Sequence, residues 1–362
     1  MSYAPPSSAK PFTLHVPDSD LSSWRQLLEL TPLGPKTYEN TQAKRNFGRD
    51  QEKHINSYPN YKMKVEDIDL HFIALFSQKK DAVPIIFMHG WPGSFIEFLP
   101  LCDLVKKQYE GKDLPYHIIV PSLPGYTLSS GGPPDRDWTT RDSARILNGL
   151  MKNLGFNRYL AQGGDVGSDV GTTLATTYDE CVGVHLNMLL SREPPDRSTL
   201  SALEISALDR SLEWIKTGTA YAQEHATRPS TIGHVLSSNP LALLAWIGEK
   251  FIDWTDTTPP LDSILTDVSL YWFTQGFPRS LYPYRTLLSG DRLAKPFIEK
   301  PTGFSFFPKE LFPGLKPMVE KQANLVTYVK HERGGHFAAL GQPKELWGDV
   351  EEYVNKAWSA KQ

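Results

Sequence analysis

The sequence predicts an α/β fold built around a parallel sheet, because short apolar runs alternate with segments of helical periodicity. The candidate strands are residues 84–88, 116–120, 159–161, 182–186 and 324–329. Glycines follow the first and third runs and a proline follows the second, as expected of buried strands that end in tight turns. In such folds the ligand site lies at the carboxyl ends of the strands. The turns after these strands are therefore the places to search for functional residues.

A crossover helix is predicted between the second and third of these strands. Thr139 and Asp142 have the spacing of a capping box, with Asp in place of Glu. Apolar side chains then repeat at helical intervals from Ile146 to Leu154, and Gly155 ends the pattern. A helix between two buried runs supports the parallel arrangement of the strands.

Upstream of this core, residues 70–75 have the pattern of an edge strand in a hairpin. Downstream, the strand signal disappears between Arg192 and Lys300, where helical patterns take over at residues 203–215, 241–252 and 261–273. After Pro343, apolar residues again line one helix face. We therefore expect an α/β core with an inserted helical cap and an ordered N-terminal arm that wraps both. The expected boundaries are residues 1–80 for the arm, 81–191 and 301–362 for the core, and 192–300 for the cap.

Composition excludes several classes of function. The 362 residues carry a formal charge of −3 and contain no Lys/Arg block that could neutralise a run of phosphates, so nucleic acid is not an expected partner. Cys102 and Cys181 are the only cysteines, which excludes a disulfide scaffold and a thiolate zinc cluster. The first residues lack the pattern of a signal peptide, and no apolar run reaches about 18 residues. The expectation is a soluble, cytoplasmic protein with no membrane partner.

The segment GGDVG at residues 163–167 has the shape of a nucleophile elbow, a tight turn between a strand and a helix that we expect to begin near Val170. Asp165 occupies the central position, where Ser is usual. An aspartate is already ionised at pH 7 and can attack carbon without a base, forming an ester with the enzyme. The alternative interpretation is a glycine-rich turn with a capping aspartate.

Hydrolysis of such an ester requires a histidine base and an acidic residue that orients it, in the chain order nucleophile, acid, histidine. His336 follows the last predicted strand in a glycine-rich loop and is the candidate base. Glu310, which precedes that strand, is the preferred acid, and Glu320 and Glu332 are rivals. A structural histidine in a glycine loop is the alternative for His336.

The segment HGWPGS at residues 89–94 follows the first core strand, where α/β-hydrolases supply one backbone N–H of the oxyanion hole. The backbone N–H groups of Trp91 and Val166 are the predicted pair, which would stabilise the charge formed when water attacks the ester. His89 itself is expected to have a structural role.

Taken together, these motifs resemble those of the microsomal-type epoxide hydrolases, and most closely those of the soluble fungal members. The shared motifs are residues 89–94 (HGWPGS), 123–126 (LPGY), 162–168 (QGGDVGS), 304–309 (FSFFPK) and 334–339 (GGHFAA). The resemblance implies an α/β-hydrolase fold and two ring-opening tyrosines in the cap. Tyr221 matches the first of these tyrosines and Tyr284 the second, with Tyr282 as a neighbouring alternative.

This chain departs from the family pattern at two positions. Val166 stands directly after the candidate nucleophile, where many relatives have Trp, so only its backbone N–H can carry a function. Glu310 stands where close fungal relatives have Asp, although other branches use Glu. The resemblance also implies a cap-mediated homodimer.

The expected activity is that of an epoxide hydrolase, a hydrolase acting on ether bonds. Asp165 attacks one oxirane carbon while Tyr221 and Tyr284 protonate the oxygen, and water activated by His336 and Glu310 then cleaves the ester. The partners are a small hydrophobic epoxide and water, and no cofactor or metal is required.

Three alternatives are weaker. A haloalkane dehalogenase also uses an Asp nucleophile, but its leaving halide requires indole N–H donors, commonly one directly after the nucleophile, and Val166 has none. A non-catalytic binding protein of this fold would have no need to keep all of these residues together. Residues 331–336 (HERGGH) resemble the H-E-x-x-H motif of zinc peptidases but have one residue too many for both histidines to share a helix face.

Overall fold

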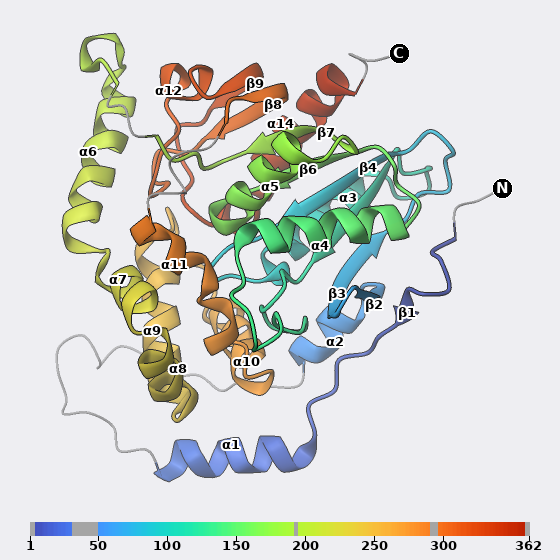
Figure 1. Ribbon diagram of the computed structural model, residues 1–362, viewed down its shortest axis with the longest axis vertical. Helices are drawn as coiled ribbons and strands as arrows, with labels where there is room; N and C mark the ends of the chain where they lie inside the picture. The colour runs from blue at the N-terminus through green and yellow to red at the C-terminus, as the bar shows by residue number, and fades with distance from the viewer. Residues whose placement is uncertain (1–3, 31–49, 192–194, 290–295, 359–362) are drawn as a thin grey trace.

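The computed structural model describes residues 4–30, 50–191, 195–289 and 296–358. Within these residues nine strands form one sheet in the order β1-β2-β3-β5-β4-β6-β7-β8-β9 (Figure 1). The strands are β1 (Lys10–Pro11), β2 (Asn60–Val65), β3 (Ile68–Leu75), β4 (Val83–Met88), β5 (Tyr116–Pro121), β6 (Tyr159–Gly163), β7 (Cys181–Leu186), β8 (Ile298–Phe306) and β9 (Ala323–Lys330). Strands β4 to β9 pair in parallel, whereas β1, β2 and β3 are antiparallel to their neighbours. The five predicted core strands are confirmed as β4, β5, β6, β7 and β9.

Two predictions about the strands were wrong or incomplete. The segment 70–75 does form a hairpin, as β3 paired with β2, but β3 also pairs with β5 and is therefore not an edge strand. The sequence pattern did not indicate β8. That strand contains Lys300 and Pro301, and its register against β9 shifts on either side of Thr302. An interrupted, partly polar strand of this kind lacks the continuous apolar run by which the other parallel strands were found.

The helices of the described residues fall into three groups. Those of the arm are α1 (Asp18–Leu30) and α2 (Asp50–Asn56). Those that pack on or beside the sheet are α3 (Leu99–Gln108), α4 (Thr140–Asn153), α5 (Asp165–Thr177), α12 (Lys316–Glu320), α13 (Ala338–Gly341) and α14 (Pro343–Ala357). Between β7 and β8 lie α6 (Ala202–Thr217), α7 (Ala220–Thr227), α8 (Pro229–Ser237), α9 (Pro240–Asp253), α10 (Leu261–Phe273) and α11 (Tyr282–Ser289).

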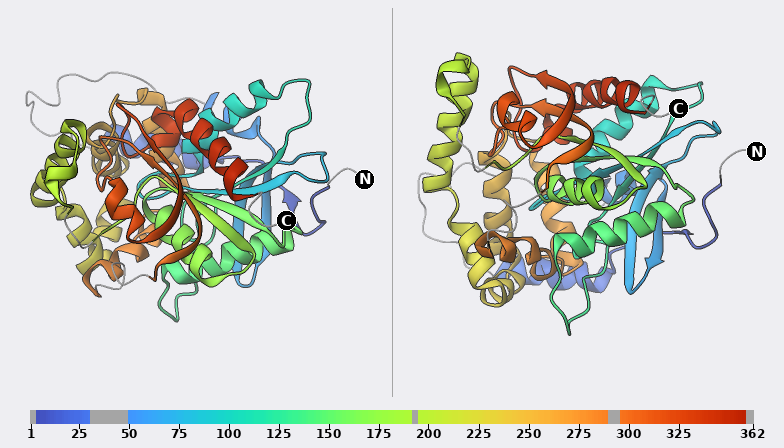
Figure 2. Two further views of the ribbon diagram at one scale, coloured as in Figure 1. Left: turned by 90° about the horizontal axis from the view of Figure 1, so that it is seen from above. Right: turned by 45° about the horizontal axis from the view of Figure 1, so that its top comes forward.

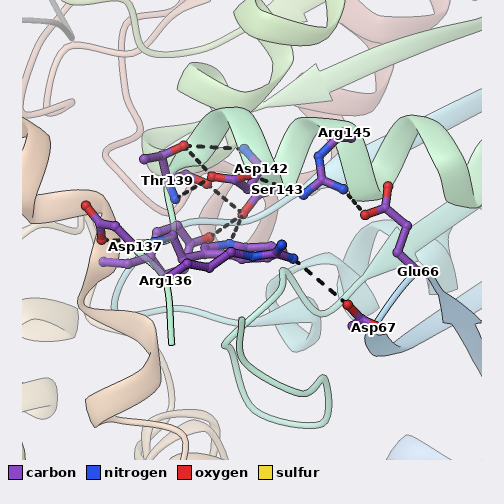
Figure 3. Close-up of polar contacts among 10 residues, drawn as sticks. Glu66, Asp67, Arg136, Asp137, Thr139, Asp142, Ser143 and Arg145 are labelled. Atoms are coloured by element: carbon purple, nitrogen blue, oxygen red, sulfur yellow. Dashed lines mark hydrogen bonds and ion pairs between the residues drawn. The ribbon is translucent and has the colours of Figure 1, made fainter. Parts of the chain in front are cut away.

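Helices α4 and α5 cover one face of the sheet, and α3 and α14 cover the other (Figure 2). The predicted capping box at the start of α4 is present. The Thr139 hydroxyl accepts a hydrogen bond from the Asp142 N–H, and the Asp142 carboxylate accepts one from the Thr139 N–H (Figure 3). Arg145, one turn further along α4, forms an ion pair with Glu66 in the turn between β2 and β3. Local capping and a side-chain ion pair thus hold α4 against the sheet.

Helices α6 to α11 lie over the end of the sheet where the parallel strands end (Figure 1). The three predicted helical segments of this region are confirmed within α6, α9 and α10, whereas α7, α8 and α11 were not predicted. Arg192, the predicted start of the cap, lies outside the described residues. Helix α1 of the arm contacts α9. No helix of the described residues is both long enough and apolar enough to span a membrane.

Candidate active site

The turn between β6 and α5 presents Asp165 above the carboxyl end of the sheet. Asp165 has a positive φ of 48° and is the first residue of α5. We expected the helix to begin near Val170, and it begins five residues earlier. Space around the turn is minimal. A Cβ on Gly163 would lie 2.2 Å from the carbonyl oxygen of Gly167, and a Cβ on Gly167 would lie 2.2 Å from that of Met88. Only glycine fits these positions, which confirms the predicted elbow geometry.

The carboxylate of Asp165 is held between two loops. The backbone N–H of Trp91, in the loop after β4, donates a hydrogen bond of 2.8 Å to Asp165 Oδ1. His336 Nε2 lies 3.5 Å from the other carboxylate oxygen, Oδ2. The Asp165 side chain is 21% exposed, so it remains accessible. Trp91 therefore occupies the position predicted for an oxyanion-hole donor, and the same role for the N–H of Val166 stays a prediction.

His336 is oriented by Glu310. An isolated bridge between Lys309 and Gly335 continues the pairing of β8 and β9 into the loops that follow them. Glu310 and His336 are the next residues after this bridge, one on each loop. As a result, Glu310 Oε1 lies 2.7 Å from His336 Nδ1, which leaves Nε2 to face Asp165. Both side chains are buried, to 0% and 2% exposure.

The rival acids lie elsewhere. Glu320 and Glu332 are exposed, and the carboxylate of Glu320 forms an ion pair with Lys316 on α12. The structure therefore brings Asp165, Glu310 and His336 together in the arrangement predicted for nucleophile, acid and base.

Opposing effects set the pKa of His336. Burial lowers it, whereas the charge of Glu310, the hydrogen bond to Glu310 and the charge of Asp165 raise it, and the net result is a pKa above its ordinary value. The imidazolium is thus favoured while both carboxylates are ionised. Because the folded-state pKa lies above the unfolded value of about 6.5, this interaction stabilises the fold below that pH. The stabilisation is lost as the pH rises through the folded-state pKa.

Tyr221 on α7 and Tyr284 on α11 contact each other and the ring of Trp91, the residue whose N–H bonds to Asp165. The Trp91 ring stacks on Tyr221, with centroids 5.2 Å apart, and contacts Tyr284 edge to face at 5.6 Å. Burial raises the pKa of Tyr284 well above its ordinary value, and the charges of Tyr221 and Asp165 and a hydrogen bond to Tyr221 raise it further. Tyr284 therefore keeps its proton at neutral pH and remains a hydrogen-bond donor.

Tyr282, the alternative to Tyr284, lies farther from this cluster. Its hydroxyl is 2.8 Å from the Ser143 hydroxyl on α4, and its ring packs edge to face against Tyr126. The geometry therefore favours Tyr284 as the second tyrosine.

A small pocket lies beside Asp165 and His336, and Glu97 lines it. Glu97 is buried in the 3-10 helix η2 (Phe95–Phe98), and its Oε1 has no hydrogen-bond partner among the described residues. Burial, with the nearby charges of Asp267 and Asp165, raises the pKa of Glu97 well above its ordinary value, which favours the protonated carboxyl. The sequence analysis missed Glu97. The signal was a charged residue inside the otherwise apolar run FIEFL at residues 95–99.

The remaining histidines of the motifs have structural partners. His89 accepts a hydrogen bond of 3.0 Å from the backbone N–H of Leu123 at its Nε2, consistent with the structural role expected for it. His331 Nε2 lies 2.7 Å from Asp349 on α14, whereas His336 bonds to Glu310. The two histidines of the HERGGH segment thus have separate carboxylate partners and do not converge on one site.

Comparison with known families finds two models that match this chain. A model described as "Epoxide hydrolase N terminus" matches residues 46–98, and the model of the alpha/beta hydrolase fold matches residues 83–241. The first covers the end of the arm and the HGWPGS segment. The second includes the elbow around Asp165 and the first helices of the cap.

Individual relatives match over nearly the whole chain. The solved structure of Aspergillus niger epoxide hydrolase is 44% identical and superposes with a TM-score of 0.92, covering 98% of this chain and 99% of its own. Epoxide hydrolase 1 of Oryctolagus cuniculus is 30% identical over 96% of this chain and 89% of its own length. The juvenile hormone epoxide hydrolase of Bombyx mori is 24% identical with a TM-score of 0.84, over 99% of this chain and 96% of its own, a likeness of fold.

The assignment of Glu310 as the acid can be tested by titrating His336. Glu310→Gln removes the charge that raises the pKa of His336, so the pKa is expected to fall below its wild-type value, because burial then acts with less opposition. NMR titration of the His336 ring would measure the shift. Glu320→Gln and Glu332→Gln are the matched controls and should leave the titration unchanged. The assignment would be contradicted if the pKa of His336 were unchanged in Glu310→Gln but shifted in Glu320→Gln or Glu332→Gln.

Proposed function

The chain belongs to the epoxide hydrolase family, and from this premise we propose that it converts an epoxide and water into a vicinal diol through an ester on Asp165. The observation that carries the proposal is the placement of Asp165. One carboxylate oxygen accepts the Trp91 N–H and the other faces His336, while two phenols lie on the cap side of the same site. The mechanism has two half-reactions, and different residues serve each.

In the first half-reaction, an oxygen of Asp165 attacks one oxirane carbon. The bond between that carbon and the ring oxygen breaks, and its electron pair goes to the oxygen. Tyr221 and Tyr284 donate hydrogen bonds to this oxygen as negative charge develops there, and one phenol gives it a proton. The products are an alkyl ester of Asp165 and a free hydroxyl group on the neighbouring carbon.

In the second half-reaction, water loses a proton to His336 and its oxygen attacks the ester carbonyl carbon. The bond between this carbon and the alkyl oxygen then breaks, and the departing alkoxide takes the proton that remains on the added oxygen, which leaves the diol and the Asp165 carboxylate. Esterification removes the negative charge of Asp165, which is one cause of the raised pKa of His336. The pKa of His336 therefore falls when the ester forms, and the neutral imidazole becomes available to take a proton from water. Glu310 holds the ring and stabilises the imidazolium, and the N–H groups of Trp91 and Val166 stabilise the oxyanion.

Glu97 is well placed to hold the hydrolytic water. The pocket that it lines with Gln162, Asn187 and His336 reaches Asp165. A protonated carboxyl can donate one hydrogen bond to water and accept another. Water bound in this pocket would approach the ester from the side of His336, opposite the cap tyrosines.

The aromatic cap side favours a small hydrophobic epoxide as substrate. The rings of Trp91, Tyr221 and Trp254 contact one another above the nucleophile. Val166 provides no indole N–H for a halide, so the same elbow is poorly suited to dehalogenation. Assembly as a homodimer through the cap stays a prediction.

Replacing the base should separate the two half-reactions. In His336→Gln, Asp165 can still be alkylated, but ester hydrolysis is expected to slow by about 10²- to 10⁴-fold, the usual contribution of a general base. Mass spectrometry of enzyme mixed with styrene oxide should then show an adduct of one substrate mass on the peptide that contains Asp165. Asp165→Ala, the control, should form no adduct. An adduct in that control, or on another peptide of His336→Gln, would contradict the nucleophile assignment.

The two tyrosines of α11 provide a matched pair of variants. Tyr284→Phe removes a donor to the ring oxygen and is expected to slow ester formation by about 10²-fold. Tyr282→Phe removes the hydroxyl that contacts Ser143 and should change the rate by less than about twofold. Rapid-quench measurement of ester formation checks both variants. The reverse order of effects would identify Tyr282 as the donor.

A further inference from the structure

A lysine of the cap lies against one of the two phenols. Lys250 on α9 is buried, with 7% of its surface exposed, and its ammonium nitrogen lies 4.9 Å from the centroid of the Tyr221 ring. The same nitrogen lies 5.6 Å from the centroid of Trp246 and forms an ion pair with Glu249. Glu249 is 56% exposed, so this partner is on the solvent side of the ammonium group. The proposed mechanism gives Lys250 no role.

A second titratable group that contacts both phenols, His225, is uncharged. His225 contacts both Tyr221 and Tyr284 edge to face, with centroid distances of 5.4 Å and 4.7 Å. Its Nε2 accepts a hydrogen bond from the indole N–H of Trp246, at 3.0 Å. Burial, and then the charge of Lys250, lowers the pKa of His225 to about 3, so its imidazole is neutral. The ammonium group is therefore the positive charge that acts on Tyr221 from this side of the cap.

We propose that the ammonium group of Lys250 stabilises the phenolate that Tyr221 becomes when it protonates the ring oxygen, which makes Lys250 a positioning residue for ring opening. The proposal rests on the proposed function, because it concerns the acid of the first half-reaction. A cation over an aromatic face is attracted to the neutral ring, and the attraction is greater when the ring carries a negative charge. The ammonium thus favours loss of the phenol proton.

The environment of Tyr284 acts in the same direction. Burial, and then the charge of Tyr221, raises the pKa of Tyr284 well above its ordinary value, so Tyr284 keeps its proton and donates a hydrogen bond to the ring oxygen. Tyr221, the phenol beside the ammonium group, is therefore the one that we assign as giving up its proton. After ester hydrolysis the phenolate takes a proton back from solvent, so Lys250 neither gains nor loses a proton in the cycle.

Lys250 can hold its charge at neutral pH despite its burial. Burial, partly opposed by the charge of Asp253, lowers the pKa of Lys250 to about 8. At pH 7 most molecules therefore carry the ammonium form of Lys250. Because this group is buried, its cation–π attraction to the Tyr221 ring is stronger than that of a solvent-exposed pair.

The test compares neutral and charged replacements of Lys250 at pH 7.0, with styrene oxide as the probe. Ester formation is followed by rapid quench and mass spectrometry in the His336→Gln background, and ester hydrolysis by single-turnover diol release with His336 present. Lys250→Met is expected to slow ester formation about tenfold and to leave ester hydrolysis within twofold, while Lys250→Arg restores most of the loss. Lys250→Gln serves as a second neutral variant if Lys250→Met does not fold.

Glu249→Gln is the matched control, because it breaks the same ion pair and keeps the ammonium. It should not slow ester formation. A second readout places 3-fluorotyrosine at position 221 and follows its ¹⁹F shift against pH, where Lys250→Met should raise the pKa of this phenol by about one unit.

Several results would overturn the proposal. These are an unchanged rate of ester formation in the neutral variants, equal slowing of both half-reactions, or slowing in Glu249→Gln that matches Lys250→Met. Absence of an ester in His336→Gln with Lys250 intact would instead overturn the proposed function, and this proposal with it.

Discussion

The close approach of two loops at the carboxyl end of the sheet is the constraint on which the site depends. The turn after β6 carries Asp165, and the loop after β4 carries the Trp91 N–H that bonds to its carboxylate. Two glycines allow this contact. Gly167 lies against the backbone of Met88, and Gly90 lies so close to Asp165 that a Cβ there would be 2.2 Å from Oδ1. A side chain at either glycine would push the loops apart, so the nucleophile and its oxyanion donor are built by backbone packing and glycine.

A second constraint is the burial of charge around this contact. Glu310 is fully buried beside His336, and the two are compatible because the imidazole bonds directly to the carboxylate. Glu97 and Asp267 are also buried, and burial raises their pKa values, that of Asp267 to about 8, which favours the neutral form of each. A neutral Glu97 beside Asp165 can act as a hydrogen-bond donor. The charge of Asp165 is lost when the ester forms, and His336, 3.5 Å away, is close enough for its pKa to respond.

The sequence predicted the parts of this site that depend on local pattern. Asp165 and His336 follow predicted strands at glycine-rich turns, and the structure places them together. Glu310 was preferred over Glu320 and Glu332 because it precedes the last strand, and the bridge between Lys309 and Gly335 shows why that position meets the histidine. The tyrosines could be found only through the resemblance to epoxide hydrolases, since α7 and α11 have no distinctive periodicity. Local sequence patterns did not predict strand β8, the pocket around Glu97 or the position of Lys250, because these features depend on tertiary contacts.

The central claim is that the oxygen added to the epoxide comes from the Asp165 carboxylate. The direct measurement is a single turnover of excess enzyme with styrene oxide in ¹⁸O-labelled water, followed by mass spectrometry of the diol and of the peptide that contains Asp165. The ester mechanism predicts that the first-turnover diol lacks the label and that the peptide gains it, because water attacks the ester carbonyl. Asp165→Ala should produce no diol under the same conditions. Label that appears directly in the first-turnover diol would contradict the account, because water itself would then be the nucleophile.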